Sequence, residues 1–414
     1  MRRLTTCCRL RLLGEIPDRW PVLFTRSGLQ LVLLLTTLVC ATTHADDTEI
    51  TYLLQSASGD AMVKLQSDRP AVPASTVKLI TALLALEHWG RDGRFNTVFH
   101  YEPTTQTLGI KGSGDPFLVS EELALIAAAL KTNGIRTIDR IVLDSSLFAA
   151  DLQVPGASQT ANPYDAVPSA LAANFNTINV KRVGEQYASA EPQTPLTAFA
   201  ESIARSRPKE VGRMNIGFTQ DNAEQYFVEI LTALLANEGI EFSGNIARGE
   251  VTQLPVVLKH QSSRTIGDLV SLMLLYSNNF IASQLILALT AEETGQPADF
   301  DQVALYLRRN VIERFGWQNA VLKEGAGLSR DNRLSAAQLV NIVEALTPWQ
   351  DVIPQYKDTI FAKTGTLSNV STLAGIIKRD NGRTDPFAIL AHGQSATETL
   401  QQTLQQMLGK PQAQ

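Results

Sequence analysis

The spacing of apolar residues predicts two strands and a helix near the start of the chain. Apolar runs at 50–54 and 61–65 flank a turn rich in Ser, Gly and Asp, which is the pattern of two adjacent strands. From Ser75, shortly after a proline, apolar residues recur at helical spacing as far as Gly90. We therefore expect a strand pair followed by a helix whose first turn contains Ser75.

Beyond residue 92 the pattern of apolar residues changes twice. Between 93 and 261, strand-like and helical runs alternate and are separated by prolines and glycines. Helical patterns then dominate, and strand-like runs return near the carboxyl end. The predicted helices are 265–290, 299–315, 335–346 and 396–408, and the predicted late strands are 359–363, 371–377 and 387–391. The last helix is amphipathic with a glutamine-rich polar face, which favours packing against a sheet over binding to a membrane.

Strands thus lie at both ends of the chain with helices between them. This order predicts an α/β (α+β) fold in which distant pieces of the chain complete one sheet. We assign 46–92 and 262–414 to that domain and 93–261 to an inserted α/β region. The length of 414 residues also favours two or more domains.

The first 45 residues differ in kind from the rest. Six arginines precede an apolar run at 29–41, and a Thr-His-Ala segment with small residues follows at 43–45. This is the pattern of a secretory signal peptide, and the run is shorter than the roughly 20 residues that a membrane span needs. We expect export to the periplasm, cleavage near Ala45 and no stable membrane insertion afterwards. Retention of the leader as an anchor is the alternative.

Composition excludes several classes of function. The formal net charge of −5 argues against a nucleic-acid-binding protein, which needs a basic face to neutralise phosphates. All three cysteines lie in the leader, so the remaining chain offers no disulfide, thiolate nucleophile or cysteine metal site. The four histidines beyond the leader share no metal-ligand spacing. We expect neither a metal nor a cofactor.

Ser75 and Lys78 form the first candidate for chemistry. Residues three apart on a helix share a face, so the hydroxyl and the amine can meet. The dipole at a helix start and burial both favour a lowered lysine pKa, which lets a neutral amine take the serine proton. The S-x-x-K motif alone is weak, because about one copy per chain of this length arises by chance. A second copy begins at Ser206, which we interpret as a loop. An N-cap serine beside a solvated lysine explains Ser75 equally well.

A second polar group interrupts an apolar stretch at Ser277-Asn278-Asn279. Polar groups inside such a run need a reason to be buried. Ser277 can relay a proton to a leaving amine, and Asn279 can hold a substrate amide. A polar junction between helix and loop is the simpler explanation for this motif by itself.

The third group is Lys363-Thr364-Gly365, followed by Thr366, on a predicted strand. Glycine lets a substrate backbone approach closely, and the N–H of the next residue can donate to an oxyanion. The lysine and threonine suit a terminal carboxylate. A lysine at a strand end before a turn is the alternative.

The three motifs in this order resemble those of the penicillin-recognising serine enzymes. Longer segments extend the resemblance to the low-molecular-mass, class C penicillin-binding proteins, the D-alanyl-D-alanine carboxypeptidase/endopeptidase family. These segments are 73–78, 112–116, 143–148, 325–330 and 362–367. The long separation of Ser75 from Ser277 also fits this family, which carries inserted domains there.

The resemblance implies a penicillin-binding/β-lactamase-like transpeptidase domain and a set of roles. Ser75 would be the acylated nucleophile and Lys78 its base, with Ser277 assisting. The substrate would be bound by Asn279, Lys363, Thr364, Gly365 and Thr366, with an oxyanion hole made by the N–H groups of Ser75 and Thr366. Peptidoglycan stem peptides would be the substrates and β-lactam antibiotics covalent inhibitors.

Two departures from the family pattern concern the choice of substrate more than the core chemistry. Asn278 stands where the family usually has aspartate, and Glu324-Gly-Ala-Gly replaces the usual Asp-Gly-Ser-Gly. Three other functions on the same scaffold remain open: a β-lactamase, a catalytically silent cell-wall-binding protein, and an esterase.

Overall fold

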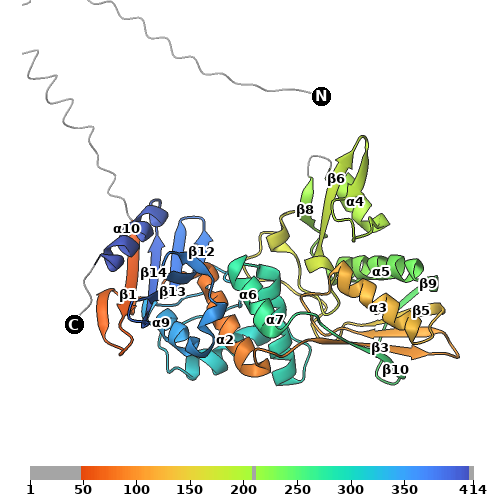
Figure 1. Ribbon diagram of the computed structural model, residues 1–414, viewed down its shortest axis with the longest axis horizontal. Helices are drawn as coiled ribbons and strands as arrows, with labels where there is room; N and C mark the ends of the chain where they lie inside the picture. Colours follow the sequence, from red (N-terminus) through yellow and green to blue (C-terminus); the bar gives the residue numbers. More distant parts are fainter. Residues whose placement is uncertain (1–47, 208–210, 410–414) are drawn as a thin grey trace, which may run out of the picture. The chain divides into compact units, whose positions relative to one another are not determined.

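Three β-sheets organise the part of the chain that the computed structural model describes, residues 48–207 and 211–409 (Figure 1). The predicted leader and its cysteines lie outside the described residues. Contacts group the chain from Thr48 onward into one unit.

The first sheet joins the two ends of the described chain. Its strands, in spatial order, are β11 (Gln355–Lys357), β12 (Ile360–Leu367), β13 (Val370–Lys378), β14 (Thr384–His392), β1 (Glu49–Gln55) and β2 (Ala61–Leu65). All neighbours are antiparallel, and β1 pairs with β14 from Glu49 opposite His392. The prediction that distant pieces of the chain complete one sheet is confirmed.

Alternate residues of this sheet pack against different helices, as the two-residue period of a strand requires. Leu373 of β13 and Phe387 of β14 pack with α10 (Ala396–Leu408), whereas Ala374 and the next residue of β14, Ala388, belong to the core around α2. The final helix therefore covers one face of the sheet, as its amphipathic pattern predicts (Figure 1).

The other face is covered by a group of helices that carries most of the core. These elements are η1 (Ala74–Val77), α2 (Lys78–Trp89), α6 (Ile266–Leu275), α7 (Asn279–Thr294), α8 (Phe300–Leu307), η4 (Arg308–Glu313), α9 (Ala336–Ala345) and η5 (Thr347–Val352). Helix α2 is buried along almost its whole length, from Lys78 to Leu86. A helix that is apolar on all sides belongs in the interior of a protein.

Two predicted helices differ from the observed ones at places that matter for function. Ser75 lies in a 3₁₀ turn, and α2 begins only at Lys78. The predicted helix 265–290 is broken between α6 and α7, because Ser277 has a positive φ of 52° that a helix cannot contain. Asn278 then caps α7 by accepting a hydrogen bond from a backbone N–H.

The strands between 93 and 261 build two smaller sheets. The five-stranded sheet has the order β10 (Val256–Gln261), β3 (Asn96–Glu102), β4 (Thr107–Lys111), β5 (Thr137–Asp144) and β9 (Glu241–Arg248), with β4, β5 and β9 parallel. The three-stranded sheet comprises β7 (Gln186–Ser189), β6 (Thr177–Val183) and β8 (Gly212–Asn215). The accompanying helices are α3 (Ser120–Thr132), η2 (Pro163–Asp165), η3 (Asn174–Asn176), α4 (Ala198–Ser206) and α5 (Gln220–Asn237). The proposed limits of the inserted region stay a prediction.

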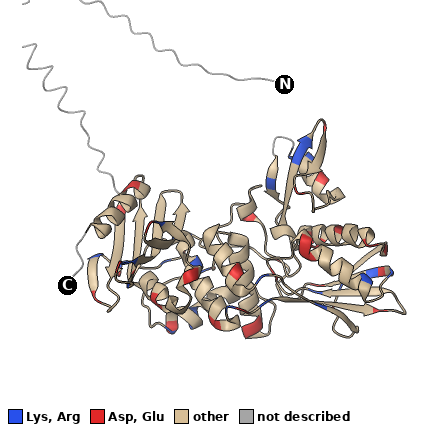
Figure 2. Cartoon of the chain, viewed as in Figure 1, with Lys and Arg blue, Asp and Glu red and all other residues tan. Residues whose placement is uncertain are grey.

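Acidic and basic residues are distributed along the described chain (Figure 2). None of the described helices is long and apolar enough to cross a membrane.

Candidate active site

The segment that carries Ser75 is held against the large sheet from several sides. The hydroxyl of Thr372 on β13 donates to the Pro73 carbonyl at 2.8 Å, and Ala71 forms a β-bridge with Leu334. Ala74, directly before the serine, is buried and has a φ of 48°. A non-glycine residue in this region is strained and persists only where its surroundings enforce it. The backbone beside Ser75 is therefore fixed by tertiary contacts.

Lys78 begins α2 and is fully buried, with 0% exposure. Its Nζ lies 3.1 Å from Ser75 Oγ and 2.7 Å from Asn279 Oδ1, and it also contacts the Ala326 carbonyl. Burial lowers the pKa of Lys78 to about 7, the charge of Lys363 lowers it too, and the charge of Glu324 opposes both. A lysine tuned in this way is neutral in a large part of the molecules at neutral pH.

The three partners of Lys78 suit a neutral amine that acts as a base. A neutral amine has two N–H donors and one lone pair. The donors can go to the Asn279 and Ala326 oxygens, which accept only. The lone pair then faces Ser75 Oγ and can receive its proton, so the geometry supports activation of this hydroxyl.

Asn279 joins the site from the start of α7. Its Oδ1 accepts from Lys78, while its Nδ2 donates to the Tyr164 carbonyl at 3.2 Å, which orients the amide. Ser277 lies at the strained junction before this helix and is partly exposed. In the described structure its hydroxyl makes no hydrogen bond with Ser75 or Lys78, so Asn279 is the residue of this motif that is hydrogen-bonded to the lysine.

Strand β12 brings the third motif to the same place. Lys363 is 1% exposed, and burial lowers its pKa to about 8. Its Nζ donates to the Thr364 carbonyl at 2.7 Å, and both Thr364 and Thr366 are exposed. Ala362 N–H points away from β13, since it donates to Pro354 at 2.9 Å.

That direction fixes the orientation of the later N–H groups. Alternate N–H groups of a strand point to the same edge, so those of Thr364 and Thr366 also point away from β13. Strand β11 pairs only with Ile360 and Phe361, so this edge is free of a strand partner within the described residues. It can accept an extended peptide.

The space around Gly365 leaves no room for a side chain. A Cβ atom there would lie 2.2 Å from Thr372 Oγ1 and 2.9 Å from the Ser75 backbone nitrogen. Such distances are far shorter than van der Waals contact. The K-T-G motif is therefore in contact with the backbone of Ser75, although the two are almost 300 residues apart in sequence.

Glu324 belongs to the site although the motif analysis gave it no role. It is fully buried, with 0% exposure, and its carboxylate accepts from the N–H groups of Ala326, Gly327 and Ser329 at 2.6–3.1 Å. The amide of Asn332 donates to it at 2.7 Å. The available signal in the sequence was the departure of this segment from the family pattern.

The structure describes only part of the second S-x-x-K copy. Ser206 is the last residue of α4 and donates to the Ile203 carbonyl, so the interpretation of this serine as part of a loop was wrong. Lys209 lies outside the described residues. The described residues also contain no group of three or more His, Cys, Asp or Glu side chains placed to hold a metal ion.

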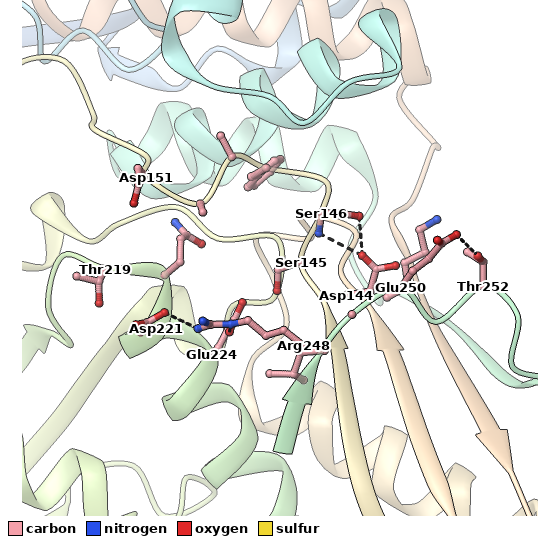
Figure 3. A pocket seen from close by; sticks show the side chains of 17 residues that line it. Asp144, Ser145, Ser146, Asp151, Thr219, Asp221, Glu224, Arg248, Glu250 and Thr252 are labelled. Carbon is pink, nitrogen blue, oxygen red and sulfur yellow. Dashed lines mark hydrogen bonds and ion pairs between the residues drawn. The ribbon is translucent and has the colours of Figure 1, made fainter. Parts of the chain in front are cut away.

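A separate pocket of about 630 Å³ lies at the carboxyl ends of β5 and β9 (Figure 3). Here Arg248 is paired with Asp221 and with Glu224, the latter at 2.5 Å, and Asp144 accepts from the Ser146 hydroxyl. None of the predicted catalytic residues lines this pocket. Five carboxylates and two basic side chains line it, so the pairing with Arg248 neutralises only part of the negative charge.

The comparisons with known proteins agree with this geometry. The family model described as "D-Ala-D-Ala carboxypeptidase 3 (S13) family" matches residues 45–360 and 351–410. The chain belongs to this family of serine-type D-Ala-D-Ala carboxypeptidases. The resemblance drawn from the sequence motifs is thereby confirmed.

Individual relatives are distant but cover most of the chain. A D-alanyl-D-alanine carboxypeptidase DacB of Haemophilus influenzae is 24% identical over 388 residues, covering 78% of this chain and 80% of the relative. A D-alanyl-D-alanine carboxypeptidase of an Actinomadura species is 23% identical over 84% of this chain and 78% of the relative.

Solved structures confirm the predicted fold class. The crystal structure of penicillin binding protein 4 (dacB) from Haemophilus influenzae matches with a TM-score of 0.71 and 20% identity, covering 88% of this chain and 97% of that one. A predatory peptidoglycan endopeptidase of Bdellovibrio bacteriovorus matches with a TM-score of 0.51 and 17% identity, covering 88% and 94%.

Proposed function

We propose that this chain is an exported D-alanyl-D-alanine carboxypeptidase that uses Ser75 as its nucleophile and Lys78 as its general base. The observation that carries the proposal is the buried Lys78 amine, 3.1 Å from Ser75 Oγ, with its other contacts directed to acceptors. A lysine buried without a carboxylate hydrogen-bonded to it costs stability, and such costs concentrate at functional sites.

The reaction begins when Lys78 takes the proton of Ser75 and Oγ attacks the carbonyl carbon of the penultimate D-alanine. The N–H groups of Ser75 and Thr366 stabilise the oxyanion of the tetrahedral intermediate. The C–N bond then breaks, and the leaving amine takes a proton that Lys78 returns with Ser277 as relay. Water attacks the resulting ester with Lys78 again as base and regenerates Ser75.

Lys363 and Thr364 bind the substrate carboxylate. The backbone of the substrate peptide runs along the free edge of β12. Strand addition of this kind places main-chain hydrogen bonds on both sides of a scissile peptide. Asn279, held by Tyr164, supplies an amide for the substrate chain. The substrates are stem peptides of peptidoglycan, in keeping with the family.

Cleavage of cross-linked peptides is a second proposed activity. The edge of β12 beyond Ala362 supports it, because within the described residues this part has no strand partner and can bind a peptide on either side of the scissile bond. A structural relative named as a peptidoglycan endopeptidase shares the fold. Release of dimer-derived products from purified cross-linked muropeptides would distinguish it from action on terminal D-alanine alone.

Acylation by penicillin tests the proposal directly. Residues 46–414 are incubated with penicillin, and the intact mass is compared with that of a Ser75→Ala variant. We expect a single stable adduct on the wild type and none on the variant. An adduct that survives the substitution would overturn the assignment of Ser75. Rapid turnover of a chromogenic cephalosporin would favour a β-lactamase, and absence of any adduct would favour a wall-binding protein.

A further inference from the structure

Glu324 stands beside the catalytic group in an unusual position for a carboxylate. It is fully buried, yet no lysine or arginine is hydrogen-bonded to it in the described structure. Its partners are backbone N–H groups and the Asn332 amide. Hydrogen bonds donated by N–H groups offset part of the cost of burying a carboxylate.

The loop that Glu324 holds makes direct contact with both Ser75 and Lys78. The Ala326 carbonyl accepts from Lys78 Nζ, and the adjacent Ala326 N–H donates to Glu324 at 2.6 Å. Gly327 has a φ of 83°, and a Cβ there would lie 2.0 Å from the Ala74 carbonyl and 2.8 Å from the Ser75 nitrogen. The carboxylate thus fixes the loop that fits against the nucleophile.

The charges around Lys78 give Glu324 a second effect. The charged groups that act on Lys78 are Lys363 from β12 and Glu324 from this loop. Two lysines buried in one site repel each other, and one carboxylate offsets part of that repulsion. Without it, the pKa of Lys78 would be lower still, since the charge of Glu324 raises it.

We propose that Glu324 is a positioning residue for the acylation step, which fixes the Ala326 carbonyl against Lys78 and supplies the negative charge that balances Lys78 and Lys363. This inference rests on the proposed role of Lys78 as base. It gives a physical reason for a fully buried carboxylate that contacts neither substrate nor nucleophile.

Two substitutions separate the charge from the geometry. Glu324→Gln removes the charge and replaces one carboxylate oxygen by an NH₂ group. An NH₂ group at the position of the oxygen that now accepts from the Ala326 N–H could not accept that bond. Glu324→Asp keeps the charge but withdraws it by one methylene. Glu224→Gln is a matched control, because Glu224 is also a buried glutamate but lines the separate pocket of Figure 3.

Two measurements are needed on each variant. The first is the titration of Lys78, followed by NMR of ¹³C-labelled lysine with its signal assigned by Lys78→Met. The second is the rate of penicillin acylation as a function of pH. The titration requires no acyl transfer, so failure of the proposed function and failure of this inference are distinguishable.

In Glu324→Gln we expect the Lys78 midpoint to fall by about one pH unit and the maximal acylation rate to fall about tenfold or more. In Glu324→Asp the midpoint should stay in place while acylation slows several-fold. The Glu224→Gln control should change neither. If Glu324→Gln does not fold, the test rests on Glu324→Asp. An unchanged acylation rate in Glu324→Asp would then overturn the proposal. An unshifted midpoint in a folded glutamine variant also overturns it.

Discussion

The site around Ser75 and the pocket beside Arg248 hold their basic side chains in opposite ways. In the pocket, Arg248 is exposed and paired with Asp221 and Glu224 (Figure 3). In the site around Ser75, Lys78 and Lys363 are buried close enough for the charge of Lys363 to depress the pKa of Lys78, and neither lysine donates to a carboxylate. An exposed arginine paired with carboxylates costs little stability, whereas buried amines that donate to no carboxylate persist where their reactivity is used.

The comparison teaches that carboxylates lining a pocket do not by themselves mark the reactive site of this protein. The pocket of about 630 Å³ contains several carboxylates, and Asp144 already accepts bonds from neighbouring Ser146. The reactive site is marked by lowered lysine pKa values, a strained Ala74 and a glycine pressed against Ser75. Three predictions test this contrast.

The largest effect is expected from Lys78→Met. Loss of the base should reduce acylation of Ser75 by about 10²–10⁴-fold. The same change should stabilise the fold at pH 7, by about 2 kcal/mol, because it removes an amine whose charged form is penalised by burial. Acylation is followed by intact mass and stability by urea unfolding.

The sign of the stability change follows from the lowered pKa of Lys78. The unfolded chain keeps this proton up to its ordinary range, while the folded protein releases it near pH 7. Between these limits the unfolded state binds more protons, so the wild type gains stability as pH rises and the advantage of the variant shrinks. Lys259→Met, at an exposed lysine of β10, is the control and should alter neither property. A destabilised Lys78→Met would contradict the idea that the lysine is costly.

A change of pH is expected to have a medium effect on activity. The active form needs Lys78 neutral and Lys363 charged, and the pKa values of the two lysines are lowered to about 7 and about 8. The kcat/KM for a D-Ala-D-Ala peptide should therefore be bell-shaped with a maximum between these values, falling roughly tenfold per pH unit outside them.

Lys363→Met tests whether Lys363 causes the alkaline limb of this pH profile. It should abolish the alkaline limb and, by removing a nearby cation, move the acid limb to higher pH. A wild-type profile that keeps rising beyond pH 9 would show that the proton of Lys363 is not needed.

The smallest effect on catalysis is expected from Arg248→Met in the pocket. Acylation of Ser75 should stay within about twofold of wild type, since none of the predicted catalytic residues lines this pocket. The free energy of unfolding should fall by about 1–3 kcal/mol, because Glu224 is 5% exposed and loses its partner. Arg140→Met, at an exposed arginine of β5, serves as the control for both measurements. A large loss of acylation would mean that the pocket and the site around Ser75 are coupled.

Local patterns were sufficient to predict most of the elements that build the site. The final helix 396–408 is observed with the predicted bounds, and the strands around Lys363 and 371–377 lie where their apolar runs place them. These predictions succeed because side-chain periodicity reflects burial on one face or both. The break at Ser277 was missed, since a positive φ in a serine is imposed by surroundings and has no local signature.

The sequence identified some residues of the candidate site and missed others. Motif spacing identified Ser75, Lys78 and Asn279, which the structure joins by hydrogen bonds. It gave no role to Glu324, whose partners are mostly backbone N–H groups of its own loop. Backbone N–H groups occur at almost every residue, so the spacing of side chains does not show which carboxylate will accept from them.

The sequence by itself determined the chemical groups, their order along the chain and the family to which the chain belongs. Only the tertiary structure decided that Lys78 is fully buried, that Lys363 lies near enough to depress its pKa, and that Gly365 touches the backbone of Ser75. The physical reason is that burial and electrostatic interaction depend on distances through space. Residues separated by up to almost 300 positions come together only when the sheet and the helices pack.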